Sequence, residues 1–274
     1  MRTRPPRRAS QLGRRYGSLV QDGRGHLVAT PTSYVFRHGR TVLPTLAEVT
    51  LDVAAGEFVS IVGPSGCGKS TFLNVLAGLV SPDSGRILID DQDVTGITGG
   101  AAYHPQRDVL LPWRRVIDNV TLGLEVQGLS RTSARGRVVD LFEPFGLHGF
   151  ERSYPFQLSG GMRQRAALLR TVVQNRPVLL LDEPFAALDA LTRSEVQEWL
   201  ADLWQRYRWT VVLVTHDIRE AVYLSDRVIV FSPRPARVSA EIRIDQPRPR
   251  RADTQQGRSF EAMVHAALRR GNRA

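Results

Sequence analysis

Lysine is almost absent from this 274-residue chain: of its 37 lysines and arginines, only Lys69 is a lysine. A chain that uses arginine almost everywhere but keeps one lysine indicates a demand at that position for a compact ammonium group rather than a planar guanidinium fork. Cysteine is just as scarce, because Cys67 is the single cysteine. A lone cysteine excludes a disulfide within the chain and is typical of a reducing compartment.

Long apolar runs are missing as well. No stretch approaches the roughly 18–20 apolar residues that a membrane-spanning helix needs. The basic start, MRTRPPRRAS, is not followed by an apolar segment, so we expect no secretory signal. The longest apolar stretches, VLLLD and VVLVT among them, have the length of buried strands. Any role at a membrane therefore requires a partner protein.

The net charge of +10 is concentrated at the two ends of the chain. Residues 1–25 contain seven arginines and one acidic residue, and residues 232–274 contain ten arginines and four acidic residues. The intervening residues 26–231 are close to neutral, at −2. Two readings of the basic ends stay open: contact with anionic lipid or nucleic acid, or, more simply, solvated arms.

The segment GPSGCGKST carries the clearest chemical signal. It lies between the apolar run EFVSIV and the helix-prone run TFLNVLAGL, which is the strand, loop and helix context of a phosphate-binding loop. Its glycines allow backbone N–H groups to turn toward phosphate oxygens, and the following helix adds its positive end. The predicted nucleotide-binding residues of this loop are Gly63, Pro64, Ser65, Gly66, Cys67, Gly68, Lys69, Ser70 and Thr71.

Within this loop each polar side chain has an expected role. Lys69 reaches the β- and γ-phosphates, Ser70 coordinates Mg²⁺, and Thr71 helps to hold the α-phosphate. Upstream, Phe36 is predicted to stack on the nucleotide base, with Tyr34 as the competing choice. A role as a core aromatic is equally compatible with the sequence at either position. ATP and Mg²⁺ are the cofactors that this motif predicts.

The rest of the chain has an α/β pattern with one interruption. Residues 1–25 lack periodicity and are expected to be a disordered Arg-rich extension. Residues 26–235 are expected to form the ATPase domain, which starts with an antiparallel β subdomain because LAEVTLDV alternates apolar and polar residues. Mostly helical residues, about 107–170, form an inserted subdomain. Residues 236–274 are expected to be a C-terminal extension with a linker and a short helix.

Three further segments carry polar side chains at positions suited to chemistry. The segment LSGGMRQR opens a helix whose N-terminus is suited to an anion. The apolar strand VLLLDEP delivers Asp182 and Glu183 at its carboxyl end, where open α/β sheets place their active sites. The apolar strand WTVVLVTHD ends at His216 and Asp217.

Taken together, these motifs resemble the ATP-binding subunits of ABC transporters over about residues 28–235. LSGGMRQR followed closely by VLLLDEP is similar to the family's signature and Walker B strand. The resemblance implies that Asp182 supports Mg²⁺ and that Glu183 is the general base that polarises the attacking water. It also implies that Gln106 is the Q-loop glutamine, which contacts Mg²⁺, and that His216 is the switch histidine at the γ-phosphate.

The same resemblance implies a head-to-tail dimer of nucleotide-binding subunits. Ser159, Gly160 and Gly161 of one chain are expected to close over ATP held by the opposing chain, with Asp189 in the loop that meets it. Closure binds ATP and hydrolysis reopens the dimer, and the helical subdomain passes this motion to transmembrane permease subunits. The chain is thus expected at the cytoplasmic face of the cell membrane as a peripheral protein.

Two stretches, LLPWRRVIDNVTLGLE and DEPFAALDALTR, look like importer subunits of the nitrate, sulfonate, taurine and pyrimidine-precursor group. This likeness implies import of a small organic or inorganic solute and an external solute-binding protein. One departure concerns Pro105, which stands before Gln106 where the family has Phe. Because proline removes an N–H and biases His104 toward an extended backbone, the path of the Q-loop is expected to differ.

Two other functions are compatible with parts of the sequence. A soluble ABC ATPase that acts on nucleic acid or ribosomes would account for the basic ends, although such proteins typically carry two nucleotide domains or a long coiled coil, and this chain has neither. A purely structural nucleotide-binding module would need no general base at Glu183. We therefore expect the importer ATPase and expect nucleic acid not to be a partner.

Overall fold

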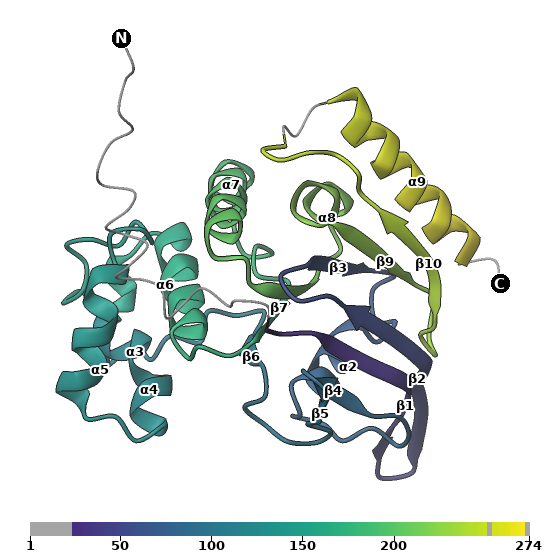
Figure 1. Ribbon diagram of the computed structural model, residues 1–274, viewed down its shortest axis with the longest axis horizontal. Helices are drawn as coiled ribbons and strands as arrows, with labels where there is room; N and C mark the ends of the chain where they lie inside the picture. Colours follow the sequence, from purple (N-terminus) through teal and green to yellow (C-terminus); the bar gives the residue numbers. More distant parts are fainter. Residues whose placement is uncertain (1–23, 251–253, 272–274) are drawn as a thin grey trace.

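In the computed structural model, which describes residues 24–250 and 254–271, two β-sheets enclose one helix (Figure 1). The expected disordered extension, residues 1–25, lies outside the described residues except for its last two. Of these, Gly25 donates its backbone N–H to Asp90 Oδ1 at 2.8 Å. Across the described ranges, no helix has both the length and the apolar composition needed to cross a membrane.

The larger sheet has six strands in the described part of the chain, all parallel except β10 at one edge. In spatial order they are β10 (Val238–Arg243), β9 (Arg227–Phe231), β3 (Phe58–Val62), β8 (Thr210–Val214), β7 (Val178–Asp182) and β6 (Ala102–His104). Every residue of β3, β7 and β8 is buried. Parallel strands are covered on both faces, which explains why these segments are continuous apolar runs.

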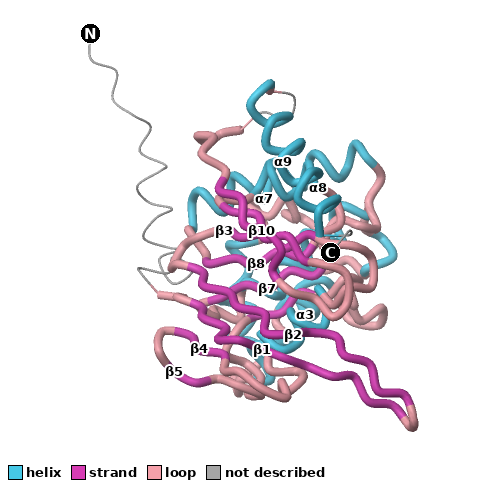
Figure 2. Tube along the Cα trace, turned by 90° about the vertical axis from the view of Figure 1, so that its right-hand side faces the viewer, coloured by secondary structure: helices cyan, strands magenta, loops and turns pink. Residues whose placement is uncertain are grey.

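The smaller sheet is antiparallel, as predicted from the alternation before the glycine-rich loop. Its strands, in spatial order, are β2 (Thr41–Val53), β1 (Leu27–His38), β4 (Ile87–Ile89) and β5 (Gln92–Asp93). Strands β1 and β2 continue beyond the sheet as a long hairpin (Figure 2). Phe36 and Leu43 pair directly across this hairpin.

Helix α2 (Lys69–Leu76) lies between the two sheets. Its Phe72 and Leu73 are fully buried and pack with Val49 of β2 and Ile61 of β3 in one apolar cluster. Because α2 begins at Lys69, directly after the glycine-rich loop, this packing fixes the position of the loop. The sandwich of two sheets around α2 thus holds the phosphate-binding loop on a rigid support.

The other face of the large sheet is covered by helices from the second half of the chain. Helices α6 (Gly160–Val172) and α7 (Ala190–Tyr207) pack against it, with Trp204 and Tyr207 among the largest buried side chains. The inserted helical subdomain extends this core and lies to the left in Figure 1. Its elements besides α6 are α3 (Val116–Val120), α4 (Leu122–Val126), α5 (Arg131–Val138), η2 (Val139–Leu141) and η3 (Pro155–Gln157).

The C-terminal residues are held against the domain rather than extended into solvent. Strand β10 pairs with β9, and α9 (Gln255–Gly271) packs on α8 (Ile218–Leu224) through a third apolar cluster (Figure 1). Arg250, which lies in the sequence between β10 and α9, is only 7% exposed. The reading of a solvated basic arm therefore does not hold for Arg250, because backbone carbonyls of the fold bind its side chain.

Candidate functional site

The phosphate-binding loop opens into a pocket of about 760 Å³. The lining residues are Phe36, Leu43, Thr45, Ser65, Gly66, Gly68, Lys69, Ser70, Thr71, Gln106, Glu183, His216 and Arg234. Residues from six separate segments thus meet in one place, and most of them were predicted from the sequence. Gly63, Pro64 and Cys67 are part of the loop but do not line the pocket.

The three glycines of the loop serve two different purposes. Gly66 and Gly68 have left-handed backbone conformations, with φ of 71° and 125°. Gly63 does not, contrary to our expectation for all three glycines. Its smallness is needed for packing instead, because a Cβ there would lie 3.0 Å from both the Cβ of Phe231 and the Sγ of Cys67. Burial raises the pKa of the Cys67 thiol, which fits a small filling residue.

The ammonium group of Lys69 lies folded over the loop. Its Nζ donates to the carbonyl oxygens of Gly63 at 2.9 Å and Pro64 at 3.0 Å, and the residue is only 6% exposed. An ammonium group has three N–H donors, so these two contacts leave one for a phosphate oxygen. The two carbonyls hold the charge at the mouth of the loop, which a wider guanidinium could not fit in the same way.

Ser70 and Asp182 form an oxygen pair beside Lys69. The Ser70 hydroxyl donates to Asp182 Oδ1 at 3.0 Å, and the Tyr103 hydroxyl donates to Oδ2 of the same carboxylate at 3.3 Å. Burial raises the pKa of Asp182 above its ordinary value. Proteins bind Mg²⁺ through one or two carboxylates or hydroxyls together with substrate phosphates, so this donor set fits Mg²⁺ held on a nucleotide.

Glu183 is the centre of the polar side of the pocket. Its Oε2 lies 3.1 Å from Gln106 Nε2, which donates to it, and 3.2 Å from His216 Nδ1. The backbone of Glu183 has φ of 43°, a left-handed conformation that is uncommon outside glycine and that re-aims the side chain at the end of β7. Gln106 and His216 thus both contact the carboxylate of Glu183, which brings the three residues predicted to be catalytic together.

Pro105 does not move Gln106 out of this group. Strand β6 pairs with β7 as far as His104, opposite Leu181, so Pro105 follows the last paired residue and costs the sheet no hydrogen bond. His104 itself is fully buried between Gln164 and Thr171, and burial lowers its pKa to about 4. The sequence led us to expect a different path for the Q-loop, yet Gln106 still reaches Glu183.

Of the two aromatic residues that the sequence offered for stacking on the nucleotide base, Phe36 lines the pocket. Its side chain is exposed, at 46%, on the extended hairpin. Tyr34, two residues earlier, is half-buried and packs against the apolar cluster between the sheets. Phe36 therefore has a free face for a base, whereas Tyr34 belongs to the core.

The LSGG residues lie away from this pocket. Ser159 is the N-cap of α6, where its Oγ accepts a hydrogen bond from the backbone N–H of Met162 at 3.2 Å. Asp189 caps α7 in the same manner, with Thr192 as donor at 3.1 Å. The two caps are neighbours, because a Cβ on Gly161 would lie 2.7 Å from Thr192 Cγ2. None of Ser159, Gly160, Gly161 and Asp189 lines the pocket.

Four residues of the site were not predicted: Leu43, Thr45 and Arg234, which line the pocket, and Tyr103, which binds Asp182. Leu43 carries one usable signal, because strand pairing places it opposite Phe36. Thr45 and Tyr103 have none, since the glycine loop and Asp182 reach them only through the tertiary fold. Arg234 lies near the end of the expected ATPase domain, residues 26–235, and no motif marked it as a site residue.

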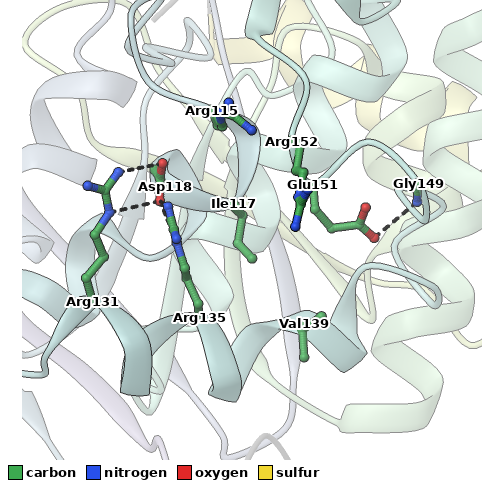
Figure 3. A pocket seen from close by; sticks show the side chains of 9 residues that line it. All are labelled: Arg115, Ile117, Asp118, Arg131, Arg135, Val139, Gly149, Glu151 and Arg152. Atoms are coloured by element: carbon green, nitrogen blue, oxygen red, sulfur yellow. Dashed lines mark hydrogen bonds and ion pairs between the residues drawn. The ribbon is translucent and has the colours of Figure 1, made fainter.

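A second concave region, of about 730 Å³, lies in the helical subdomain and contains no predicted site residue. There Arg131 and Arg135 of α5 both bind Asp118 of α3, with closest contacts of 2.7 and 2.6 Å (Figure 3). Although burial alone would raise the pKa of Asp118, these two arginines hold it below its ordinary value. The charged contacts thus join two helices of the subdomain.

Glu220 is a further buried acid close to the site. It is 4% exposed, and Gln197 donates to its Oε2 at 3.3 Å. Burial, with a contribution from the nearby charge of Asp217, raises the pKa of Glu220 to about 8. Together with Thr215, His216 and Glu183 it lines a small cavity.

Comparison with known proteins shows the family to which this chain is related. Residues 46–186 match the family model of the ABC transporter domain. Over 216 residues the chain is 44% identical to an uncharacterized ABC transporter ATP-binding protein of Methanocaldococcus jannaschii, which covers 79% of this chain and 81% of that protein. Over 231 residues it is 44% identical to the taurine import ATP-binding protein TauB of Rhizobium johnstonii, with coverage of 84% and 87%.

Solved structures show the same relationship. The dimeric structure of the bacterial ABC transporter cassette MJ0796 superimposes with a TM-score of 0.70 at 30% identity, and covers 81% of this chain and 100% of that cassette. The same cassette in a dimeric post-hydrolysis state bound to ADP and Pi gives a TM-score of 0.69 at 31% identity. Both the predicted resemblance and the predicted fold class are therefore confirmed. This chain is an ATP-binding subunit of the ABC transporter family.

Proposed function

We propose that this chain is the ATP-hydrolysing subunit of an ABC importer. One observation carries the proposal: Gln106 and His216, from separate segments, both contact the Glu183 carboxylate beside the phosphate-binding loop. A module that only bound nucleotide would not need a positioned carboxylate with two polar partners at this point. The 44% sequence identity to a taurine import subunit favours the importer over a soluble ATPase that acts on nucleic acid.

The pocket residues divide the work of phosphoryl transfer to water. Lys69 and the N–H groups of the loop hold the phosphates. Ser70, Asp182 and Gln106 would hold Mg²⁺, which neutralises charge on the β- and γ-phosphates when it is bound. The Glu183 carboxylate takes a proton from the attacking water, and His216 orients Glu183 and contacts the γ-phosphate.

The separation of the LSGG residues from the pocket supports a dimer with composite sites. Ser159 and Gly160 lie at the start of α6 outside the pocket of their own chain, next to the Asp189 cap. A helix N-terminus offers free N–H groups to an anion, so it suits the γ-phosphate held by another copy. Two copies arranged head to tail would each complete the other's site, as the dimeric form of MJ0796 suggests.

The remaining partners follow from the importer role. A subunit that powers import must bind transmembrane permease subunits from the cytoplasmic side, which makes this chain a peripheral protein of that membrane face. Solutes of the nitrate, sulfonate, taurine and pyrimidine-precursor type fit the likeness to TauB. An external protein that captures the solute completes the system.

The test is purification of the chain with its partners. We expect the chain to co-purify with a multi-span membrane protein from detergent-solubilised membranes, and the complex to transport a sulfonate such as taurine in an ATP-dependent manner. Salt-sensitive retention on nucleic acid, without any membrane partner, would contradict the proposal and favour the soluble alternative. A matched Lys69→Ala complex, which cannot hold the phosphates, controls for leakage.

A further inference from the structure

Arg234 lies on a short turn that borders the phosphate-binding loop. The turn leaves β9 at Phe231, whose Cβ would lie 3.0 Å from a Cβ on Gly63, near the start of the loop. It then reaches Ala236, whose N–H donates to the carbonyl oxygen of Thr45 at 2.8 Å. That same oxygen would lie 3.0 Å from a Cβ on Gly68, near the end of the loop. Residues 231–236 therefore follow the whole side of the loop.

The turn is held in place by its own hydrogen bonds. Ser232 and Arg237 close it, because the Ser232 N–H donates to the Arg237 carbonyl and the Arg237 N–H donates to Ser232 Oγ, each at 3.0 Å. Ala47 on β2 donates to the carbonyl of Ala236, also at 3.0 Å. The position of the Arg234 backbone is thus fixed relative to the pocket before any ligand binds.

The two arginines of this turn differ in what their side chains do. Arg237 binds Glu48 through Nη1 and Oε2 at 3.0 Å, away from the pocket lining. Arg234 lines the pocket, is exposed, and has no hydrogen bond or ion pair to its side chain among residues 24–250 and 254–271. Its five N–H donors are therefore available to a ligand.

Charge makes such a group valuable here. Within the described part of the chain, Lys69 and Arg234 are the lysine and the arginine that line the pocket, and Lys69 already uses two donors on loop carbonyls. Phosphates of a nucleotide carry several negative charges, which favours a second cation in the same pocket. A guanidinium plane also stacks on aromatic rings, including nucleotide bases.

The location of Arg234 selects the part of the nucleotide that it meets. Its turn is bound to Thr45, on the same strand as Leu43, and Leu43 pairs with Phe36. Phe36, Leu43 and Thr45 line the pocket from this hairpin, whereas Glu183 and His216, which contact each other, line it from the large sheet. We propose that Arg234 is a further nucleotide-binding residue, which contacts the ribose and base of ATP beside Phe36. The proposal rests on the proposed function, in that the pocket must hold ATP.

The experiment is isothermal titration calorimetry, which measures the Kd of ATP and of ADP for the purified full-length chain and for its variants. Because the substitution removes the stacked cation, we expect Arg234→Ala to raise the Kd by roughly tenfold. The factor should be the same for ATP and ADP, because the contact does not involve the γ-phosphate. Arg234→Lys should recover only part of the loss, since an ammonium has no plane to stack.

Arg237→Ala is the matched control: it removes an arginine from the same turn, and its exposed ion pair with Glu48 is worth little. Wild-type affinity in Arg237→Ala together with the loss in Arg234→Ala supports the proposal. Wild-type affinity in Arg234→Ala, or a loss confined to ATP, overturns it. Failure of the wild type to bind ATP, or undiminished binding by Lys69→Ala, contradicts the proposed function instead.

Discussion

Arg250 offers a direct test of how the C-terminal segment supports the site. Its guanidinium donates to the carbonyl oxygens of Val222 at 2.8 Å and Tyr223 at 3.1 Å, which belong to the last turn of α8. It also binds the carbonyls of Ser225, Gln246 and Ile244. Helix α8 begins directly after His216 and Asp217. Arg250 therefore caps the helix that follows His216, and its charge lies at the favourable end of the helix.

The magnitude follows from what the substitution leaves behind. Arg250→Ala removes five hydrogen bonds from a side chain that is 7% exposed, and the freed carbonyls lie in a region that water reaches poorly. Burial lowers the pKa of Arg250 to about 10, but the group stays charged at neutral pH. A buried acceptor that is left without its hydrogen bond costs about 1–3 kcal/mol. Taking about 3 kcal/mol, the melting temperature should fall by about 6–12 °C for a domain of this size.

Thermal unfolding, monitored by circular dichroism, measures this fall in melting temperature. Arg250→Lys should also lose stability, because three donors cannot serve five acceptors. Arg258→Ala is the control, since Arg258 lies exposed on α9 and its side chain makes no hydrogen bond or ion pair among the described residues. A melting temperature within about 1 °C of wild type in Arg250→Ala would refute the reasoning, because it would mean that the segment is not held to α8 in solution.

Two further predictions concern the loop and the buried acid. Gly68→Ala should weaken ATP binding more than Gly66→Ala in the same titration. Both glycines have positive φ, but a Cβ on Gly68 would lie 3.0 Å from a backbone oxygen, whereas a Cβ on Gly66 would meet nothing within 4 Å. Equal losses of affinity in the two variants would contradict this prediction. Glu220 has a folded pKa of about 8, above the ordinary value of 4.5, so the folded state holds its proton more tightly and the stability that this proton contributes is lost as pH rises from about 5 to 8. Glu220→Gln, which cannot ionise, should show a flatter melting temperature over that pH range than wild type, and parallel profiles would contradict the assignment.

The elements that the sequence predicted best are those specified by local pattern. Strands β3, β7 and β8 are buried on both faces, so each is an uninterrupted apolar run that can be recognised without tertiary information. The roles proposed for Lys69, Glu183 and His216 could be predicted because Lys69 belongs to the glycine-rich motif after β3, and Glu183 and His216 lie within two residues of the ends of β7 and β8. Their convergence in one pocket then follows from the parallel order of the strands.

The features that the sequence did not predict depend on contacts between distant segments. A run of arginines near a chain end has the composition of a solvated arm, yet Arg250 is buried because the end of α8 presents free carbonyls to it. Thr45 enters the site because β2 passes beside Gly68, and Arg234 because its turn is bound to Thr45. Gly63 was assigned a special backbone conformation but is required for close packing against Phe231. Composition and motif spacing do not indicate which distant segments contact each other in the fold.

The central claim is that Glu183 acts as the general base of an ATPase whose sites are completed by a second copy. Glu183→Gln tests it most directly, because glutamine preserves the size of the side chain and can still contact Gln106 and His216 but cannot take a proton. The variant and wild type would be compared by phosphate release and, with ATP and Mg²⁺ present, by light scattering. Removal of a general base lowers the rate by about 10²–10⁴-fold, so we expect hydrolysis to fall by at least about 100-fold while ATP binding persists and a stable ATP-dependent dimer accumulates. Hydrolysis at the wild-type rate, or a variant that stays monomeric with ATP bound, would contradict the account.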